Sequence, residues 1–150
     1  MVQSYQIRLR EDFMIIRNCA GGIVFNKDKV LLLLNDKHEW VFPKGVVRLG
    51  QKEKDIALLR IKIEAGLDAE ILAPCGKTSY EFYSVSRQKP IHNNVSWFVM
   101  KSDEEKVILS AEEQFIDGGF FDVSDAMNKV TYSQDKTLLM MAYQRYKELI

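Results

Sequence analysis

The sequence predicts an α+β fold in which helices flank a mixed β-sheet. Short apolar or alternating segments recur along most of the chain, and only two longer segments, near residues 52–65 and 133–149, have a helical pattern. The order is strands, one helix, strands, one helix, which is typical of an α+β sandwich. No repeat, low-complexity tract or Pro/Gly/Ser-rich linker divides the chain, so we expect one domain over residues 1–150.

Four strands are predicted in the first third of the chain: "SYQIRL" (4–9), "AGGIVF" (20–25), "KVLLLLN" (29–35) and "EWVFP" (39–43). The second and third flank Asn26, Lys27 and Asp28, which suit a hairpin turn. Residues 45–50 are expected to form a loop after Pro43 ends the fourth strand.

A helix is expected from about Lys52 to Ala65, because Gly66 follows it at the position where a helix C-terminal glycine belongs. Further strands are predicted in "AEIL" (69–72), "KTSYEFYSV" (77–85), "NVSWFVMK" (94–101) and "GGFFDV" (118–123). Asp125 to Lys129 suits a short helix, and Ser133 is a candidate cap for a last helix that ends near Leu149.

Composition excludes several classes of function. The 150 residues suffice for a sizeable core, and 21 basic residues balance 21 acidic ones, so no nucleic-acid partner is expected. No uncharged run approaches the ~18 residues that span a bilayer, and the N-terminal segment lacks the apolar core of a signal peptide. Cys19 and Cys75 lack CxxC spacing, and we expect both to be reduced thiols in a cytoplasmic protein.

The segment "PKG" is the first candidate for chemistry. Pro43 fixes the strand exit, Gly45 allows a ligand to approach the backbone, and Lys44 offers a cation to a phosphate. Taken alone, the same three residues describe an ordinary turn with an exposed lysine.

The surrounding segments distinguish the two readings. The pattern "AGGIVF…VLLL…EWVFPKG…G…E…AGL", followed by "GKTSYEF", "WFVM" and "FFDVSDA", resembles the Nudix hydrolase family, in particular its diadenosine tetraphosphate hydrolase branch. The likeness runs from about Cys19 to Tyr143. It implies a Nudix-like α/β/α sandwich around a mixed β-sheet, a small-molecule nucleotide as ligand, and Mg²⁺ or Mn²⁺ as cofactor.

The family's box reads Gly, five residues, Glu, seven residues, Arg, Glu, aliphatic, any, Glu, Glu, any, Gly, aliphatic. Five positions match this chain: Gly45, Ile61, Glu64, Gly66 and Leu67. Four depart from it: Gln51 and Leu59 replace a Glu and an Arg, and Arg60 and Ile63 replace two glutamates. The box is therefore degenerate.

The departures fall on the metal site. In the family, carboxylates at the positions of Arg60, Ile63 and Glu64 hold the divalent metals, and only Glu64 is retained. Arg60 reverses a charge, and a dication about 5 Å from a guanidinium is repelled by roughly 6 to 7 kcal/mol at an effective dielectric of about 20. We therefore expect weak binding of Mg²⁺ or Mn²⁺. Arg60 is free either to pair with Glu64 or to contact a phosphate.

Other residues are candidates through the resemblance. Glu113, beside Glu112, corresponds to a loop carboxylate that can act as metal ligand or general base, and Glu53 lies on the same helix side as Arg60. Lys77, Tyr80 and Tyr83 are candidate ligand-binding residues, and ordinary core packing or solvent exposure is the alternative for each. Ile56, Leu59 and Ile63 form an apolar stripe that suits either the core or a pocket wall.

Two hypotheses follow. The first is a Nudix domain that binds a nucleoside-polyphosphate-type ligand with weak or absent hydrolysis. The second is an active Mg²⁺-dependent pyrophosphohydrolase that uses Glu64 with Glu113 or Glu53. A protein partner or a homodimer is compatible with both, and the sequence does not specify the ligand.

Overall fold

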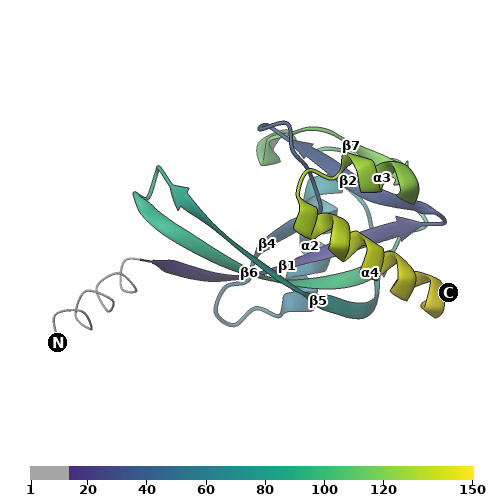
Figure 1. The fold of residues 1–150 in the computed structure, drawn as a ribbon, viewed down its shortest axis with the longest axis horizontal. Coiled ribbons are helices and arrows are strands. Elements are labelled where there is room, and N and C mark those ends of the chain that lie inside the picture. Colours follow the sequence, from purple (N-terminus) through teal and green to yellow (C-terminus); the bar gives the residue numbers. More distant parts are fainter. Residues whose placement is uncertain (1–13) are drawn as a thin grey trace.

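The computed structural model describes residues 14–150, so the strand predicted at residues 4–9 lies outside the described residues. These described residues form seven strands: β1 (Ile15–Asn26), β2 (Lys29–Asn35), β3 (Trp40–Val41), β4 (Lys44–Val46), β5 (Glu70–Ser84), β6 (Lys89–Lys101) and β7 (Phe115–Asp122). The helices are α2 (Glu53–Ala65), α3 (Val123–Lys129) and α4 (Ser133–Leu149), with a 3₁₀ turn, η1 (Ala111–Glu113). Figure 1 shows their arrangement.

The strands form one mixed sheet in the order β3-β2-β1-β6-β5, with β4 paired to β1 and β7 paired to β2. The long β1 and β6 run parallel, with Ile15 opposite Ile91 and Phe25 opposite Lys101, whereas the other strand pairs are antiparallel. The predicted hairpin is present, since Phe25 pairs with Val30 and Asn26 with Lys29. The mixed sheet and the α+β class are confirmed.

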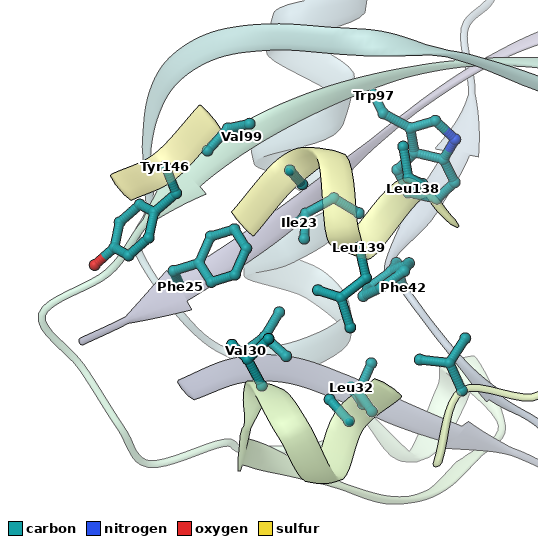
Figure 2. Packing of buried hydrophobic residues seen from close by; sticks show 14 of the residues in the cluster. Ile23, Phe25, Val30, Leu32, Phe42, Trp97, Val99, Leu138, Leu139 and Tyr146 are labelled. Carbon is teal, nitrogen blue, oxygen red and sulfur yellow. The ribbon is translucent and has the colours of Figure 1, made fainter. Parts of the chain in front are cut away.

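Alternation along the strands gives the sheet two apolar faces. On one face Ile23, Phe25, Trp97 and neighbouring core residues pack against Leu138, Leu139, Ala142 and Tyr146 of α4. Figure 2 shows this cluster, in which Phe25 stacks on Tyr146 with ring centroids 4.5 Å apart. On the other face Ala20, Val24, Phe98 and Met100 pack against Ala57, Ile61 and Ala65 of α2. Helices therefore cover both faces, as an α/β/α sandwich requires.

The helix before Gly66 forms almost where the sequence places it. α2 begins at Glu53 and ends at Ala65, and Gly66 adopts a left-handed conformation with φ 72° while its N–H bonds to the Lys62 carbonyl. Of the predicted apolar stripe, Ile56 is buried but Leu59 is 48% exposed. The stripe is therefore not a continuous core surface.

Three local expectations were wrong. Gly45 lies in β4, opposite Ala20 of β1, and not in a loop. The two segments predicted at 69–72 and 77–85 belong to one strand, β5, which passes Pro74 through register shifts at Ile71/Ala73 and Pro74/Lys77. Proline is tolerated there because β5 is an edge strand and bulged. Tyr132, and not Ser133, occupies the N-cap of α4.

The β5–β6 hairpin and the start of β1 extend well beyond the helices (Figure 1). Side chains near the end of this extension are exposed, for example Tyr83 at 61% and Val85 at 81%.

None of the helices in residues 14–150 combines the length and the apolar composition that a membrane-spanning helix requires.

Candidate active site

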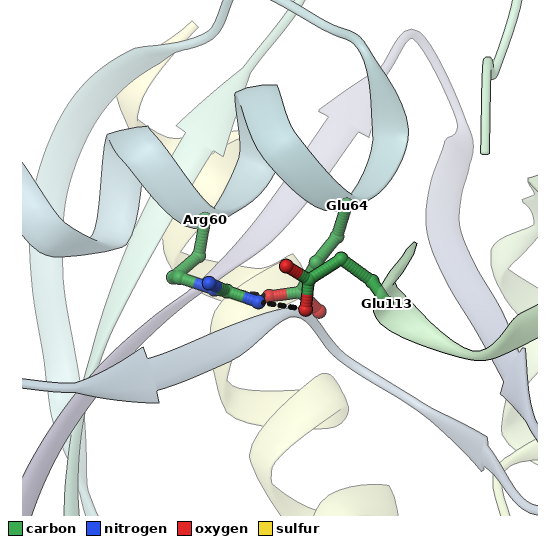
Figure 3. A network of polar contacts seen from close by, with 3 residues as sticks. All are labelled: Arg60, Glu64 and Glu113. Carbon is green, nitrogen blue, oxygen red and sulfur yellow. Dashed lines mark hydrogen bonds and ion pairs between the residues drawn. The ribbon is translucent and has the colours of Figure 1, made fainter. Parts of the chain in front are cut away.

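Three charged side chains meet beside α2. The Nε atom of Arg60 donates a hydrogen bond to Glu64 Oε2 at 2.7 Å, and its NH2 group donates to Glu113 Oε2, also at 2.7 Å. Arg60 and Glu64 are one helical turn apart, whereas Glu113 arrives from η1, 53 residues further along the chain than Arg60. Figure 3 shows the guanidinium facing the two carboxylates, with a dashed line to each.

Glu64 is the buried member of this trio. Its side chain is 2% exposed, compared with 23% for Arg60 and 30% for Glu113. Burial raises the pKa of the Glu64 carboxyl to about 7, although the Arg60 guanidinium and, more weakly, Lys44 favour the ionised form. The two ion pairs raise the pKa of Arg60 despite its partial burial. Arg60 therefore supplies the positive charge that a buried carboxylate requires.

Gly45 provides the space in which Arg60 lies. A Cβ atom at residue 45 would come within 2.4 Å of Arg60 Cδ and 2.6 Å of its Cγ. Any larger residue at position 45 would push the arginine away from both glutamates. The structure thus gives Gly45 a role toward Arg60 that the sequence did not suggest.

A cavity of about 550 Å³ opens next to the trio. This size is in the range of small-molecule sites. Its wall comes from the β2–β3 region, β4, α2, β5, β6, η1 with the start of β7, and the start of α4. The lining residues are Asn35, Asp36, Lys37, Glu39, Val41, Phe42, Lys44, Glu64, Thr78, Tyr80, Glu81, Phe82, Trp97, Glu113, Gln114, Phe115, Tyr132, Ser133, Gln134 and Asp135.

One part of the wall is aromatic. Tyr80 and Phe82 project from the same face of β5 with ring centroids 6.0 Å apart, and they are 37% and 40% exposed. The Nζ atom of Lys44 lies 5.3 Å from the centre of the Tyr80 ring. Trp97 and Phe42 contact each other edge to face at 5.9 Å. These rings offer the apolar surface on which a flat heteroaromatic group stacks.

Another part of the wall is acidic. The Tyr132 hydroxyl donates a hydrogen bond to Glu39, and this bond is the main reason that the pKa of Glu39 is lowered. Asp135, in the first turn of α4, is half-buried, and burial raises the pKa of its carboxyl while Lys44 opposes the shift. Six carboxylates line the cavity beside the two lysines Lys37 and Lys44.

The predicted residues separate into two groups. Glu64, Glu113, Lys44 and Tyr80 line the cavity, and Arg60 holds the two glutamates from outside its lining. The others lie elsewhere: Lys77 borders a second cavity of about 280 Å³ near Cys75 and α4, Tyr83 is exposed on the other face of β5 from Tyr80, and Glu53 is exposed in the first turn of α2.

Several cavity residues were not anticipated from the sequence. Asp135 and Tyr132 belong to segments that matched no motif, and Glu39 and Trp97 lie in segments of the family pattern but were not singled out as site residues. Phe82 carries a signal that the sequence does contain, because it shares the alternating face of Tyr80 two residues earlier.

The residues fit a metal site poorly. Among residues 14–150 no group of three or more His, Cys, Asp or Glu side chains is placed to hold a metal ion. The two glutamates that converge, Glu64 and Glu113, both bond to the Arg60 guanidinium. A dication between them would have to displace that cation.

The fold is a mixed sheet between helices, in which the strand after Pro43 carries Lys44 and Gly45, the following helix carries Glu64, and a ligand-sized cavity lies beside them. These features define a Nudix-type fold. The family model for the NUDIX domain matches residues 16–141, so the chain belongs to the NUDIX family. The resemblance seen in the sequence is confirmed.

Solved structures show the same fold. An Ap4A hydrolase of C. elegans in a binary complex is 22% identical, with 88% of this chain and 98% of that chain covered and a TM-score of 0.67. The dihydroneopterin triphosphate pyrophosphohydrolase of E. coli is 16% identical over 83% of this chain and 94% of that chain, with a TM-score of 0.64. A MutT NUDIX hydrolase of Burkholderia pseudomallei is 12% identical over 84% and 97%, with a TM-score of 0.64.

Proposed function

We propose that this chain is a Nudix-family domain that binds a nucleoside-polyphosphate-type ligand in the 550 Å³ cavity and hydrolyses it weakly or not at all. One observation carries the proposal. The Arg60 guanidinium bonds both Glu64 and Glu113 at 2.7 Å, where the family would place a metal between carboxylates.

The electrostatics support weak metal binding. A magnesium ion is a hard cation that takes several oxygen ligands. Here its two nearest carboxylates are already neutralised, and a guanidinium about 5 Å from the ion would repel it by roughly 6 to 7 kcal/mol at an effective dielectric of about 20. Movement of Arg60 outward would reduce this figure, but it would also leave Glu64, only 2% exposed, without its counter-charge.

The cavity supports nucleotide binding without metal. Tyr80 and Phe82 offer rings on which a nucleobase can stack, and Lys44 stands beside Tyr80 as a cation for a phosphate oxygen. The relatives named as Ap4A hydrolase and dihydroneopterin triphosphate pyrophosphohydrolase act on ligands that combine a heteroaromatic ring with phosphates. The same class of small molecule is our proposal for this chain.

An active Mg²⁺-dependent hydrolase is the second candidate, and one observation favours it. The Glu64 and Glu113 carboxylates approach a common group, so they are close enough to share a metal if Arg60 left. Glu53 does not strengthen this candidate, because it lies seven residues before Arg60 and about 10 Å along the helix axis.

A turnover assay separates the two candidates. The purified protein is incubated with diadenosine tetraphosphate and Mg²⁺ or Mn²⁺, beside the C. elegans Ap4A hydrolase as positive control and Glu64→Gln as negative control. We expect turnover far below the ordinary enzyme range of about 1–1000 per second. Turnover within that range that Glu64→Gln abolishes would establish the second candidate.

We also propose that the protein resides in the cytoplasm. Cys19 and Cys75 are both free, Cys19 buried and Cys75 half-buried, as in a reducing cytoplasm. Neither Cys19 nor Cys75 is among the residues that line the 550 Å³ cavity, and burial raises the pKa of Cys75 to about 12, so we assign the thiols no part in the chemistry.

A further inference from the structure

The acids that line the cavity differ in whether they already have partners. Glu64 and Glu113 bond Arg60, Glu39 accepts from Tyr132 and Asn35, and Glu81 bonds His92. Asp36, the remaining acid of the lining besides Asp135, is exposed, so water satisfies its carboxylate. No group within residues 14–150 donates a hydrogen bond to the half-buried carboxylate of Asp135, and no cation of that part of the chain lies within 4.0 Å of it. Asp135 is thus an acceptor that faces the cavity with its hydrogen-bonding capacity unused.

Asp135 lines the same cavity as the aromatic wall. The Nζ atom of Lys44, another lining residue, lies 5.3 Å from the centre of the Tyr80 ring. A flat ring that stacked on Tyr80 or Phe82 would therefore share the cavity with the Asp135 carboxylate. A carboxylate only accepts hydrogen bonds, so it favours an edge with an amino group and disfavours an edge with a carbonyl oxygen.

We infer that Asp135 is a specificity-determining residue, which selects ligands whose nucleobase carries an exocyclic amino group over those with an oxo group at the same position. This inference rests on the proposed nucleotide-binding function. It also explains how an acid-rich cavity accommodates a phosphorylated ligand: the base enters with donors toward the carboxylates, and the phosphates stay at the Lys44 side.

An acid in the first turn of a helix has an ordinary explanation in the helix dipole. Asp125 in the first turn of α3 needs no other, because it is exposed. Asp135 differs, since its carboxylate is half-buried at a cavity wall. Asp125→Asn is therefore a matched control: it removes the same charge from the same helical position away from the cavity.

The test compares ATP with purine riboside triphosphate, which lacks the 6-amino group, and with ITP, which carries an oxo group at that position and a proton on N1. Affinities are measured by titration calorimetry in chelator for the parent, Asp135→Asn and Asp125→Asn. We expect the parent and Asp125→Asn to prefer ATP to purine riboside triphosphate by about tenfold, the typical effect of one hydrogen bond to a charged group, and to bind ITP no more tightly than purine riboside triphosphate. Asp135→Asn, whose amide can also donate, should lose the preference for ATP while it still binds purine riboside triphosphate, which shows that its fold is intact.

Three results would overturn the inference, and they differ in meaning. Equal affinity of the parent for ATP and purine riboside triphosphate would remove the role of Asp135 and leave the proposed function standing. Failure of all three nucleotides to bind the folded parent would remove the proposed function together with the inference. An unchanged ATP preference in Asp135→Asn would assign the selectivity to another residue.

Discussion

Removal of the Arg60 guanidinium should destabilise the fold in a way that depends on pH. In the parent, the pKa of Glu64 is about 7, above the usual 4.5 of a glutamate. The folded state therefore holds this proton more tightly than the unfolded state does. The contribution of Glu64 to the free energy of unfolding is therefore largest below about pH 4.5. It falls by about 3 kcal/mol as the pH rises to about 7 and is constant at higher pH.

Arg60→Ala should extend the pH dependence of stability to pH values above 7. Without the guanidinium the pKa of Glu64 rises further, so above about pH 7 the folded variant keeps a proton that the unfolded chain has lost. The free energy of unfolding of the variant should then fall by up to about 1.4 kcal/mol for each pH unit above 7, while the parent no longer changes through this group. Near pH 9 the total cost approaches the about 3–5 kcal/mol typical of a broken buried ion pair.

Urea unfolding of both proteins between about pH 5 and pH 9 measures this difference. Other titrating groups act on both proteins and cancel in the comparison. The control is the same substitution in a Glu64→Gln background, in which the cost of Arg60→Ala should no longer depend on pH. A cost of Arg60→Ala that is flat from pH 6 to pH 9 in the otherwise native chain would refute the reasoning.

The remaining predictions concern the same site. Gly45→Ala should reproduce much of the destabilisation expected for Arg60→Ala, because the new Cβ would lie 2.4 Å from Arg60 Cδ. The same substitution should cost little stability in an Arg60→Ala background. Equal costs in both backgrounds would show that the two residues are not coupled. The double variant Arg60→Glu/Ile63→Glu should gain Mn²⁺ affinity measurable by calorimetry, and a folded double variant without it would show that the carboxylates do not converge. Lys44→Ala should weaken ATP binding by about three- to tenfold and flatten its salt dependence, and an unchanged salt dependence would place the phosphates elsewhere.

The elements that the sequence predicted well are those specified by local signals. The helix before Gly66 is one example, since a glycine is suited to the left-handed conformation that ends a helix. The hairpin at Lys27 and Asp28 is another, because two strongly apolar strands flank a short polar turn. The predicted strands at 69–72 and 77–85 are one strand, β5, because the bulges that carry the chain through Pro74 depend on pairing with β6.

The site could be predicted only in part. The box alignment identified Glu64 and the anomaly at Arg60, but the contact between Arg60 and Glu113 spans 53 residues and depends on how η1 packs beside α2. Lys77 was expected near a phosphate, and the register shift just before it leaves it bordering the second cavity. Asp135 has no motif at all. Its place in the cavity follows from the packing of α4 on the sheet, which one-dimensional patterns do not contain.

The dependence of ligand affinity on divalent metal tests the central claim most directly, namely that Arg60 takes the place of the metal. The affinity of the parent for diadenosine tetraphosphate is measured by calorimetry with excess chelator and again with Mg²⁺. We predict dissociation constants that agree within about threefold, because the charge that bridges Glu64 and Glu113 belongs to the chain itself. Binding that is absent in chelator and restored by Mg²⁺ would contradict the claim.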